Sequence, residues 1–319
     1  MIGKIRSAIA EIPYPQRPEG LYEPIEYAMS MGGKRLRPML MLLCYSVFRP
    51  DWEQAIPAAT ALELYHNHTL LHDDLMDRAD VRRGKPTVHR KWNENTAILS
   101  GDTMLLMAAQ QMARQRVGRY EDANECFLKS AIEICEGQQY DVNFEQRHDV
   151  TEEEYIEMIR LKTSVLLGCA AKIGALLADA SDDACDILYA FAEKIGLAFQ
   201  LQDDYLDCFG DEKTFGKRIG GDILCGKKTF MTVAAMQRMG DDSERDSFLA
   251  ILDAESGTPE AEEEKIKRVI SIYQKLHIAD VANARIGELY DEAHRILRNL
   301  DADTSALWDY ATSLLGRKS

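Results

Sequence analysis

The segment Leu70-Leu71-His72-Asp73-Asp74-Leu75-Met76-Asp77 places three carboxylates at the end of a long apolar run that starts near Ala55. On an α-helix, Asp73 and Asp77 lie on one face because they are four residues apart, and Asp74 lies beside them. Like charges at this spacing repel each other, so a cation is expected to offset the repulsion. Carboxylate oxygens suit a hard divalent ion such as Mg²⁺. The segment therefore predicts a metal site at the end of a buried helix.

A second acidic segment repeats this spacing. Asp203, Asp204 and Asp207 again follow an apolar run, and each acidic segment precedes a basic loop that contains glycine, at residues 82–85 and 213–218. A metal-bridged diphosphate requires both kinds of group, because the metal takes carboxylate and phosphate oxygens while basic side chains neutralise the remaining charge. One acidic segment alone could be a solvated helix end. Two such segments, each with its basic loop, indicate a diphosphate site.

A third basic site precedes both acidic segments. Gly32-Gly33-Lys34-Arg35-Leu36-Arg37-Pro38 combines two flexible glycines with three cations at the start of a predicted helix. Helix N-termini bind anions through their unpaired N–H groups. The segment therefore predicts an anion cradle formed by Lys34, Arg35 and Arg37.

Composition limits the class of protein. The chain has 319 residues, of which 46% are hydrophobic and 29% are charged, and its net charge of −15 argues against a nucleic-acid or anionic-membrane partner. No signal peptide is predicted at the N-terminus, and the apolar stretch 163–180 contains Lys172 and Asp179, which favours a core helix over an integral membrane segment. Seven cysteines without any Cys-x-x-Cys pair are typical of thiols in a reducing cytoplasm. We therefore expect a cytoplasmic location.

The predicted fold is an all-α helical bundle that forms a single domain over residues 1–319. Period-two alternation is nearly absent, and helix-favouring residues dominate the chain. Neither a linker nor a short-period repeat divides it. The expected helices cover residues 24–30, 39–47, 55–76, 96–112, 129–143, 151–177, a helix that starts at Ser181 or Asp182 and carries the second acidic segment, a helix that opens at Thr258, and residues 278–300 and 303–315.

The motifs resemble those of one family. Gly-Gly-Lys-Arg-x-Arg-Pro at 32–38, His-Asp-Asp-x-x-Asp at 72–77, Arg-Arg-Gly-Lys-Pro-Thr-x-His at 82–89, Phe-Gln-x-Gln-Asp-Asp-Tyr-Leu-Asp at 199–207 and Phe-Gly-Lys at 215–217 occur in the order found in trans-isoprenyl diphosphate synthases. Glu136-Gly137-Gln138-x-x-Asp141 lies between them. The chain thus resembles a polyprenyl synthetase of the short-chain farnesyl or geranylgeranyl type.

The resemblance implies a fold, a reaction and partners. The two acidic motifs would face each other across a deep central cavity in a homodimer that uses Mg²⁺, which Mn²⁺ could replace. Ionisation of an allylic diphosphate would be followed by head-to-tail attack of isopentenyl diphosphate and by loss of a proton to the departed diphosphate. A longer-chain synthase for quinone side chains, a non-catalytic subunit of a heteromeric synthase, and a terpene cyclase are the alternatives. The cyclase has no need of an isopentenyl diphosphate site.

The resemblance also implies roles for individual residues. The metal ligands would be Asp73, Asp74, Asp77 and Asp203, with Asp204 and Asp207 completing the second motif. The allylic diphosphate would be bound by Arg82, Lys162, Lys217 and Lys227, with Lys228 as the alternative to Lys227; isopentenyl diphosphate would be bound by Lys34, Arg37, His66 and Arg83. Thr163 and Gln200 would lie near the reacting carbons.

Product length would depend on side chains below the first acidic motif. His68 and Thr69 lie about one helical turn, roughly 5.4 Å, below Asp73, and Tyr65 lies about two turns below it. In the family, bulky residues at these depths form a floor. His68 is intermediate in size, Thr69 is small and Tyr65 is the first large group, so a C15 to C20 product is expected, with C20 favoured.

Overall fold

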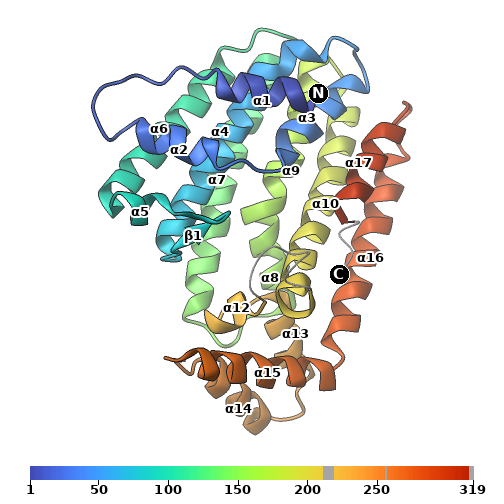
Figure 1. Ribbon diagram of the computed structural model, residues 1–319. Helices are drawn as coiled ribbons and strands as arrows, with labels where there is room; N and C mark the ends of the chain where they lie inside the picture. The colour runs from blue at the N-terminus through green and yellow to red at the C-terminus, as the bar shows by residue number, and fades with distance from the viewer. Residues whose placement is uncertain (211–218, 256, 316–319) are drawn as a thin grey trace. The chain divides into compact units, whose positions relative to one another are not determined.

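The computed structural model describes residues 1–210, 219–255 and 257–315, and the regular secondary structure in these ranges is helical apart from one short hairpin (Figure 1). The predicted all-α class is confirmed. The chain folds into two compact units, unit 1 (1–129 and 169–188) and unit 2 (130–168 and 189–319). Whether they form one domain stays a prediction. None of the helices in the described ranges combines the length and the apolar character needed to cross a lipid bilayer.

Unit 1 is built around α4 (Ile56–Met76), the predicted buried helix. Its apolar residues point in nearly every direction, and small side chains such as Ala58, Ala59 and Ala61 are fully buried. α4 packs along α6 (Glu94–Ala113) and also contacts α3 (Leu36–Ser46) and α1 (Ile2–Ala10) (Figure 1). The other elements that begin in unit 1 are α2 (Glu23–Ser30), the 3₁₀ turn η1 (Trp52–Ala55), α5 (Val88–Lys91), α7 (Tyr120–Glu145) and α10 (Asp182–Phe209).

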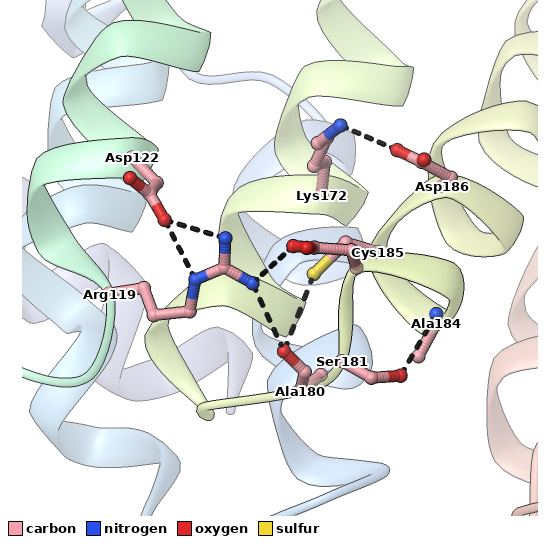
Figure 2. A network of polar contacts seen from close by, with 9 residues as sticks. Arg119, Asp122, Lys172, Ala180, Ser181, Ala184, Cys185 and Asp186 are labelled. Carbon is pink, nitrogen blue, oxygen red and sulfur yellow. Dashed lines mark hydrogen bonds and ion pairs between the residues drawn. The ribbon is translucent and has the colours of Figure 1, made fainter.

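A polar network fixes the start of α10 within unit 1 (Figure 2). The guanidinium of Arg119 donates to the Asp182 carboxylate at 2.6 Å and to the Ala180 carbonyl at 3.4 Å. The Ser181 hydroxyl accepts the backbone N–H of Ala184 at 3.3 Å, which makes Ser181 the N-cap. Of the two caps predicted for this helix, the structure selects Ser181.

The basic segment after α4 is a β-hairpin rather than the irregular loop that the sequence predicts. β1 (Val81–Arg82) pairs antiparallel with β2 (Lys85–Pro86). The two turn residues, Arg83 and Gly84, have φ of 52° and 75°, as a type I′ turn requires. The Thr87 hydroxyl donates to the Ala79 carbonyl at 2.7 Å. This bond holds the hairpin against the end of α4.

Unit 2 has its own apolar core, which includes Phe230, Phe248, Tyr273 and Leu289. Its elements are the rest of α7 and α10, α8 (Glu152–Ile159), the π-helical turn η2 (Arg160–Ser164), the start of α9 (Val165–Leu177), α12 (Gly221–Leu224), α13 (Phe230–Arg238), α14 (Asp242–Leu252), α15 (Pro259–Lys275), α16 (Ile278–Leu297) and α17 (Ser305–Leu315). The capping box predicted at the start of α8 is confirmed, because Thr151 and Glu154 exchange both hydrogen bonds.

The helix expected over 151–177 is interrupted by η2, which carries Lys162 and Thr163. π-helical turns inside α-helices often occur at functional sites. Gly137 on α7 allows this turn to approach closely, since a Cβ there would lie only 2.7 Å from the carbonyl carbon of Leu161. The glycine of the 136–141 motif therefore has a steric role.

Candidate active site

The first aspartate motif occupies the C-terminal end of α4, where Asp74 forms an ion pair with Arg82 of the hairpin. The Nε of Arg82 lies 2.8 and 2.7 Å from the two carboxylate oxygens of Asp74, and its Nη2 lies 4.0 Å from Asp73. Asp74 is buried, Asp73 is half-buried and Asp77 is exposed at the C-cap. Burial raises the pKa of Asp74, and the Arg82 hydrogen bond opposes that shift. The structure thus brings Arg82 to the first aspartate motif, and its role as a ligand of the allylic diphosphate stays a prediction.

The donor set at this end of α4 fits a hard divalent metal, because its three aspartates offer carboxylate oxygens. Among the described residues, no group of three His, Cys, Asp or Glu side chains is arranged as a ready-made metal site. Mg²⁺ does not require one, since it binds through one or two carboxylates, retains water and accepts substrate phosphate oxygens.

An arginine cluster surrounds His66 on α4. The Nη1 of Arg37 lies 3.1 Å from His66 Nε2, and Arg83 donates to the Gly32 carbonyl. Because a guanidinium only donates, Nε2 accepts and the proton of the neutral ring lies on Nδ1. Burial, followed by the charges of Arg37 and Arg83, lowers the pKa of His66 well below its usual value. Three of the four predicted isopentenyl diphosphate ligands therefore meet here; the fourth, Lys34, is exposed on the same segment as Arg37.

The prediction that Arg35 contributes to the anion cradle is wrong. Its side chain turns inward and forms an ion pair with Glu63, with only 6% of the arginine side chain and 2% of the glutamate side chain exposed. A buried guanidinium that is already neutralised is not available to a substrate anion. The sequence could not separate Arg35 from its neighbours, because nothing in the motif marks which cation faces the core.

In unit 2, the π-helical turn and α10 bring together several predicted residues. The Lys162 ammonium lies 2.6 Å from Asp141 of α7. The Thr163 hydroxyl donates to Gln200 at 3.1 Å, and the Gln200 amide donates to Asp204 at 3.1 Å. A continuous chain of hydrogen bonds therefore runs from the residues predicted near the reacting carbons to the second aspartate motif.

Asp204 is the most enclosed member of the second motif, with 3% of the residue exposed. Besides Gln200, it accepts hydrogen bonds from the Tyr155 hydroxyl and from the backbone N–H of Phe230 at 3.3 Å. Burial, with a smaller contribution from the charge of Asp222, raises its pKa to about 8. Both oxygens already accept hydrogen bonds, which favours a positioning role over direct metal binding.

The other members of the second motif lie on the same helix. Asp203 is half-buried, and Asp207 accepts the backbone N–H of Asp222 at 3.1 Å, which anchors the start of α12. Sequence reasoning missed Tyr155. Its position between the buried residues of α8 gives no sign that its hydroxyl reaches a carboxylate.

Comparison with known proteins identifies the family. The polyprenyl synthetase family model matches residues 18–273 of the chain. The chain belongs to the polyprenyl synthetase family. It is 44% identical over 236 residues to a geranylgeranyl diphosphate synthase of Methanosarcina mazei, with 73% of each chain covered. It is 40% identical over 260 residues to a short chain isoprenyl diphosphate synthase of Methanocaldococcus jannaschii, with 81% of this chain and 78% of the relative covered.

The fold comparison agrees with the family. The crystal structure of a geranylgeranyl pyrophosphate synthase matches with a TM-score of 0.92 and 39% identity, covering 100% of this chain and 99% of the other. The resemblance predicted from the motifs, and the prenyltransferase class that follows from it, are confirmed.

Lys227 and Lys228 of this polyprenyl synthetase are the two candidates for one ligand of the allylic diphosphate. Lys228 is buried, and its ammonium lies 3.3 Å from the Gly226 carbonyl and 3.7 Å from Asp253. Lys227 is only half-buried, and its backbone carbonyl accepts the Thr232 hydroxyl at 3.1 Å. The structure therefore favours Lys227 as the substrate ligand. Lys217, the other lysine predicted in this region, lies outside the described residues.

The predicted floor of the synthetase is a column of rings on α4. Tyr65 packs edge-on against Phe127 with ring centroids 5.3 Å apart, and the His68 ring lies 5.6 Å from Tyr65 and 4.7 Å from His72. Burial lowers the pKa of His68 to about 4, so its ring is neutral near pH 7. Thr69 is half-buried and donates to the His66 carbonyl at 2.8 Å. Tyr65 and His68 form one stack, whereas Thr69 lies outside it.

Proposed function

We propose that this polyprenyl synthetase condenses isopentenyl diphosphate head-to-tail with an allylic diphosphate and stops at the C20 product, geranylgeranyl diphosphate. The observation that carries the proposal is the chemistry gathered around each aspartate motif. In unit 1 the first motif and His66, which the arginine cluster surrounds, both lie on α4, and in unit 2 Gln200 joins the second motif to Thr163, next to Lys162. The similarity to geranylgeranyl diphosphate synthases supports the C20 product.

The proposed ligands form two sets, one for each diphosphate substrate. Arg82, Lys162, Lys217 and Lys227 bind the allylic diphosphate, and Lys34, Arg37, His66 and Arg83 bind isopentenyl diphosphate. Arginine forks suit the planar, paired oxygens of phosphates. His66 adds a neutral N–H donor, since its Nε2 already accepts from Arg37. This division assigns different side chains to the two diphosphates.

Charge stabilisation drives the proposed reaction. Asp73, Asp74, Asp77 and Asp203 would hold Mg²⁺, or Mn²⁺ as a substitute, and the bound ion would supply positive charge to the departing diphosphate. Arg82 and Lys162 add hydrogen bonds to the same group, and both side chains are held in place by carboxylates before substrate binds. Asp204 and Asp207 position the second motif. The dipoles of Thr163 and Gln200 stabilise the allylic cation, and the apolar walls of α4 exclude water.

The product is the direct test. Purified protein with labelled isopentenyl diphosphate and Mg²⁺ should give a C20 diphosphate from each allylic starter that it accepts. A product of C30 or longer would support the longer-chain synthase instead. Asp74→Ala and Asp204→Ala variants should lose turnover; a wild-type protein as inactive as these variants would support the non-catalytic subunit.

We also propose a homodimer. Large apolar side chains are exposed on α6 and α7 within unit 1, namely Ile98, Leu99, Leu106 and Leu128, and on the part of α7 in unit 2, namely Ile132, Tyr140 and Val142. Exposed apolar side chains in such numbers are typical of a protein interface. Light scattering should report a dimer for the wild type and a shift towards monomer for Leu99→Lys with Leu106→Lys. A monomeric wild type would contradict this proposal.

A single-domain organisation and a cytoplasmic location are proposed for the chain as well. A single domain over 1–319 predicts one cooperative unfolding transition by circular dichroism and fluorescence, whereas two separate domains predict two. A cytoplasmic location is supported by the scattered cysteines. Fractionation of the native cells tests it.

A further inference from the structure

The buried ion pair between Arg35 and Glu63 joins the 32–38 segment to the centre of α4. Both side chains are almost completely enclosed, and Arg35 also donates to the Met29 carbonyl of α2 at 3.0 Å. The Asn67 amide donates to the Glu63 side chain at 3.0 Å and to its carbonyl at 2.8 Å. The pair is therefore held from α2, from α4 and from the segment itself.

The backbone of Arg35 is part of the same arrangement. Arg35 is the N-cap of α3 and has a left-handed conformation, with φ of 53° and ψ of 43°. A non-glycine residue adopts this conformation only where its surroundings compensate for the strain. Lys34 precedes Arg35 and Arg37 follows it by two residues, so this backbone conformation sets how the chain enters α3 between them.

Glu63 lies where cations gather. Burial lowers the pKa of Arg37 to about 10, and the charge of Glu63 opposes that shift; it acts in the same sense on Arg83. One carboxylate oxygen of Glu63, Oε2, is buried and has no hydrogen-bond partner among the described residues. The charge of Glu63 thus partly offsets the positive charge of Arg37 and Arg83 before any substrate anion binds.

We propose that Glu63 is a positioning residue for isopentenyl diphosphate. Its buried carboxylate holds Arg35 and partly offsets the charge of Arg37 and Arg83, and thereby fixes the segment from which Lys34 and Arg37 bind the diphosphate. This inference rests on the proposed function, which assigns Lys34 and Arg37 to that substrate. Of the three cations in the 32–38 segment, Lys34 and Arg37 bind the diphosphate, whereas Arg35 anchors the segment to Glu63.

The experiment measures KM for each substrate separately. Glu63→Gln keeps the size of the side chain and removes its charge, and it should raise KM for isopentenyl diphosphate about tenfold, which corresponds to roughly one charge-assisted hydrogen bond. KM for the allylic diphosphate should stay within about twofold of the wild-type value, because Arg82 and Lys162 are held by other carboxylates, those of Asp74 and Asp141.

A milder variant tests the same role if Glu63→Gln does not fold. Asn67→Ala removes only the amide that supports Glu63, and KM for isopentenyl diphosphate should rise about threefold to fivefold, which is less than for Glu63→Gln because the ion pair with Arg35 remains. Trp308→Leu is the matched destabilised control, because Trp308 packs against Phe191 and His294 within unit 2. It should lower Tm and leave both KM values unchanged.

A wrong assignment of the isopentenyl diphosphate ligands and a wrong role for Glu63 give different results. If Arg37→Gln leaves KM for isopentenyl diphosphate unchanged, the substrate assignment itself is wrong. If Arg37→Gln raises that KM but Glu63→Gln and Asn67→Ala do not, the positioning role of Glu63 is overturned and the proposed function stands. A variant that lowers Tm and changes both KM values equally would show a purely structural role for Glu63, which also overturns the inference.

Discussion

Substitution of Gly137 by alanine should displace the π-helical turn that carries Lys162. A Cβ at position 137 would lie 2.7 Å from the carbonyl carbon of Leu161 and closer still to the amide nitrogen of Lys162. An ordinary van der Waals separation for a Cβ begins near 3.4 Å, so one of the two backbones must move by about 1 Å. Both partners are backbone atoms, and no side-chain rotation can relieve the clash.

The size of the effect follows from this displacement. A misplacement of about 1 Å at a substrate-binding group can cost about 100-fold in rate. We therefore expect kcat/KM for the allylic diphosphate to fall about 100-fold in Gly137→Ala, while overpacking lowers the free energy of unfolding by about 1–3 kcal/mol. Steady-state kinetics at saturating isopentenyl diphosphate, together with urea unfolding, measure the two effects.

A matched control separates displacement from general damage. Gly118→Ala in unit 1 creates a similar backbone clash, 2.6 Å from the carbonyl carbon of Leu177, and touches no predicted substrate ligand. It should lower stability and leave kcat/KM of the folded fraction unchanged. Wild-type kcat/KM in Gly137→Ala, or an equal loss of kcat/KM in both variants, would refute the reasoning.

Three further results are expected. Tyr65→Ala should lengthen the main product by one isoprene unit or more on chromatography, because it removes the largest ring of the column below the aspartates; an unchanged product would contradict the floor. Burial raises the pKa of Asp204 to about 8, so the folded state retains a proton that the unfolded chain loses near pH 4, and this stabilisation is lost as the pH rises through 8. In metal-free protein, the unfolding free energy of the wild type relative to Asp204→Asn should fall by up to about 1.4 kcal/mol per pH unit from about pH 4 to pH 8, and a constant difference would refute this. Lys227→Ala should weaken allylic binding more than Lys228→Ala, and the reverse order of KM values would assign the role to Lys228.

Local patterns predicted most of the helices. α4, α6 and α16 have continuous helical patterns, and the predicted ends of α4 and α6 lie within two residues of those observed. The helix α1 was not predicted, because it buries only Ile5 and Ile9 and gains its stability from packing against α4. The hairpin at 81–86 was also missed, since each of its strands is too short to show alternation.

The candidate site was predicted in its residue types but not in its contacts. The aspartate motifs and most of the cations are visible in sequence because their chemistry requires those residue types at that spacing. The inward turn of Arg35 and the bond from Tyr155 to Asp204 depend on tertiary contacts 28 and 49 residues apart in the chain. Charge and spacing along a single segment cannot show which partner a side chain will meet across the core.

The ring column and the first aspartate motif belong to the same uninterrupted helix, α4. The distance from Asp73 to Tyr65 along the helix is therefore fixed at about 12 Å over eight residues. The helix itself sets the distance between the site of ionisation and the ring that limits product length. Inserting one residue between Tyr65 and Asp73 would lengthen this part of α4 by about 1.5 Å, but it would also rotate Tyr65 by about 100° around the helix axis relative to Asp73. Product size should consequently change in evolution by exchange of single side chains along α4 rather than by gradual lengthening of the helix.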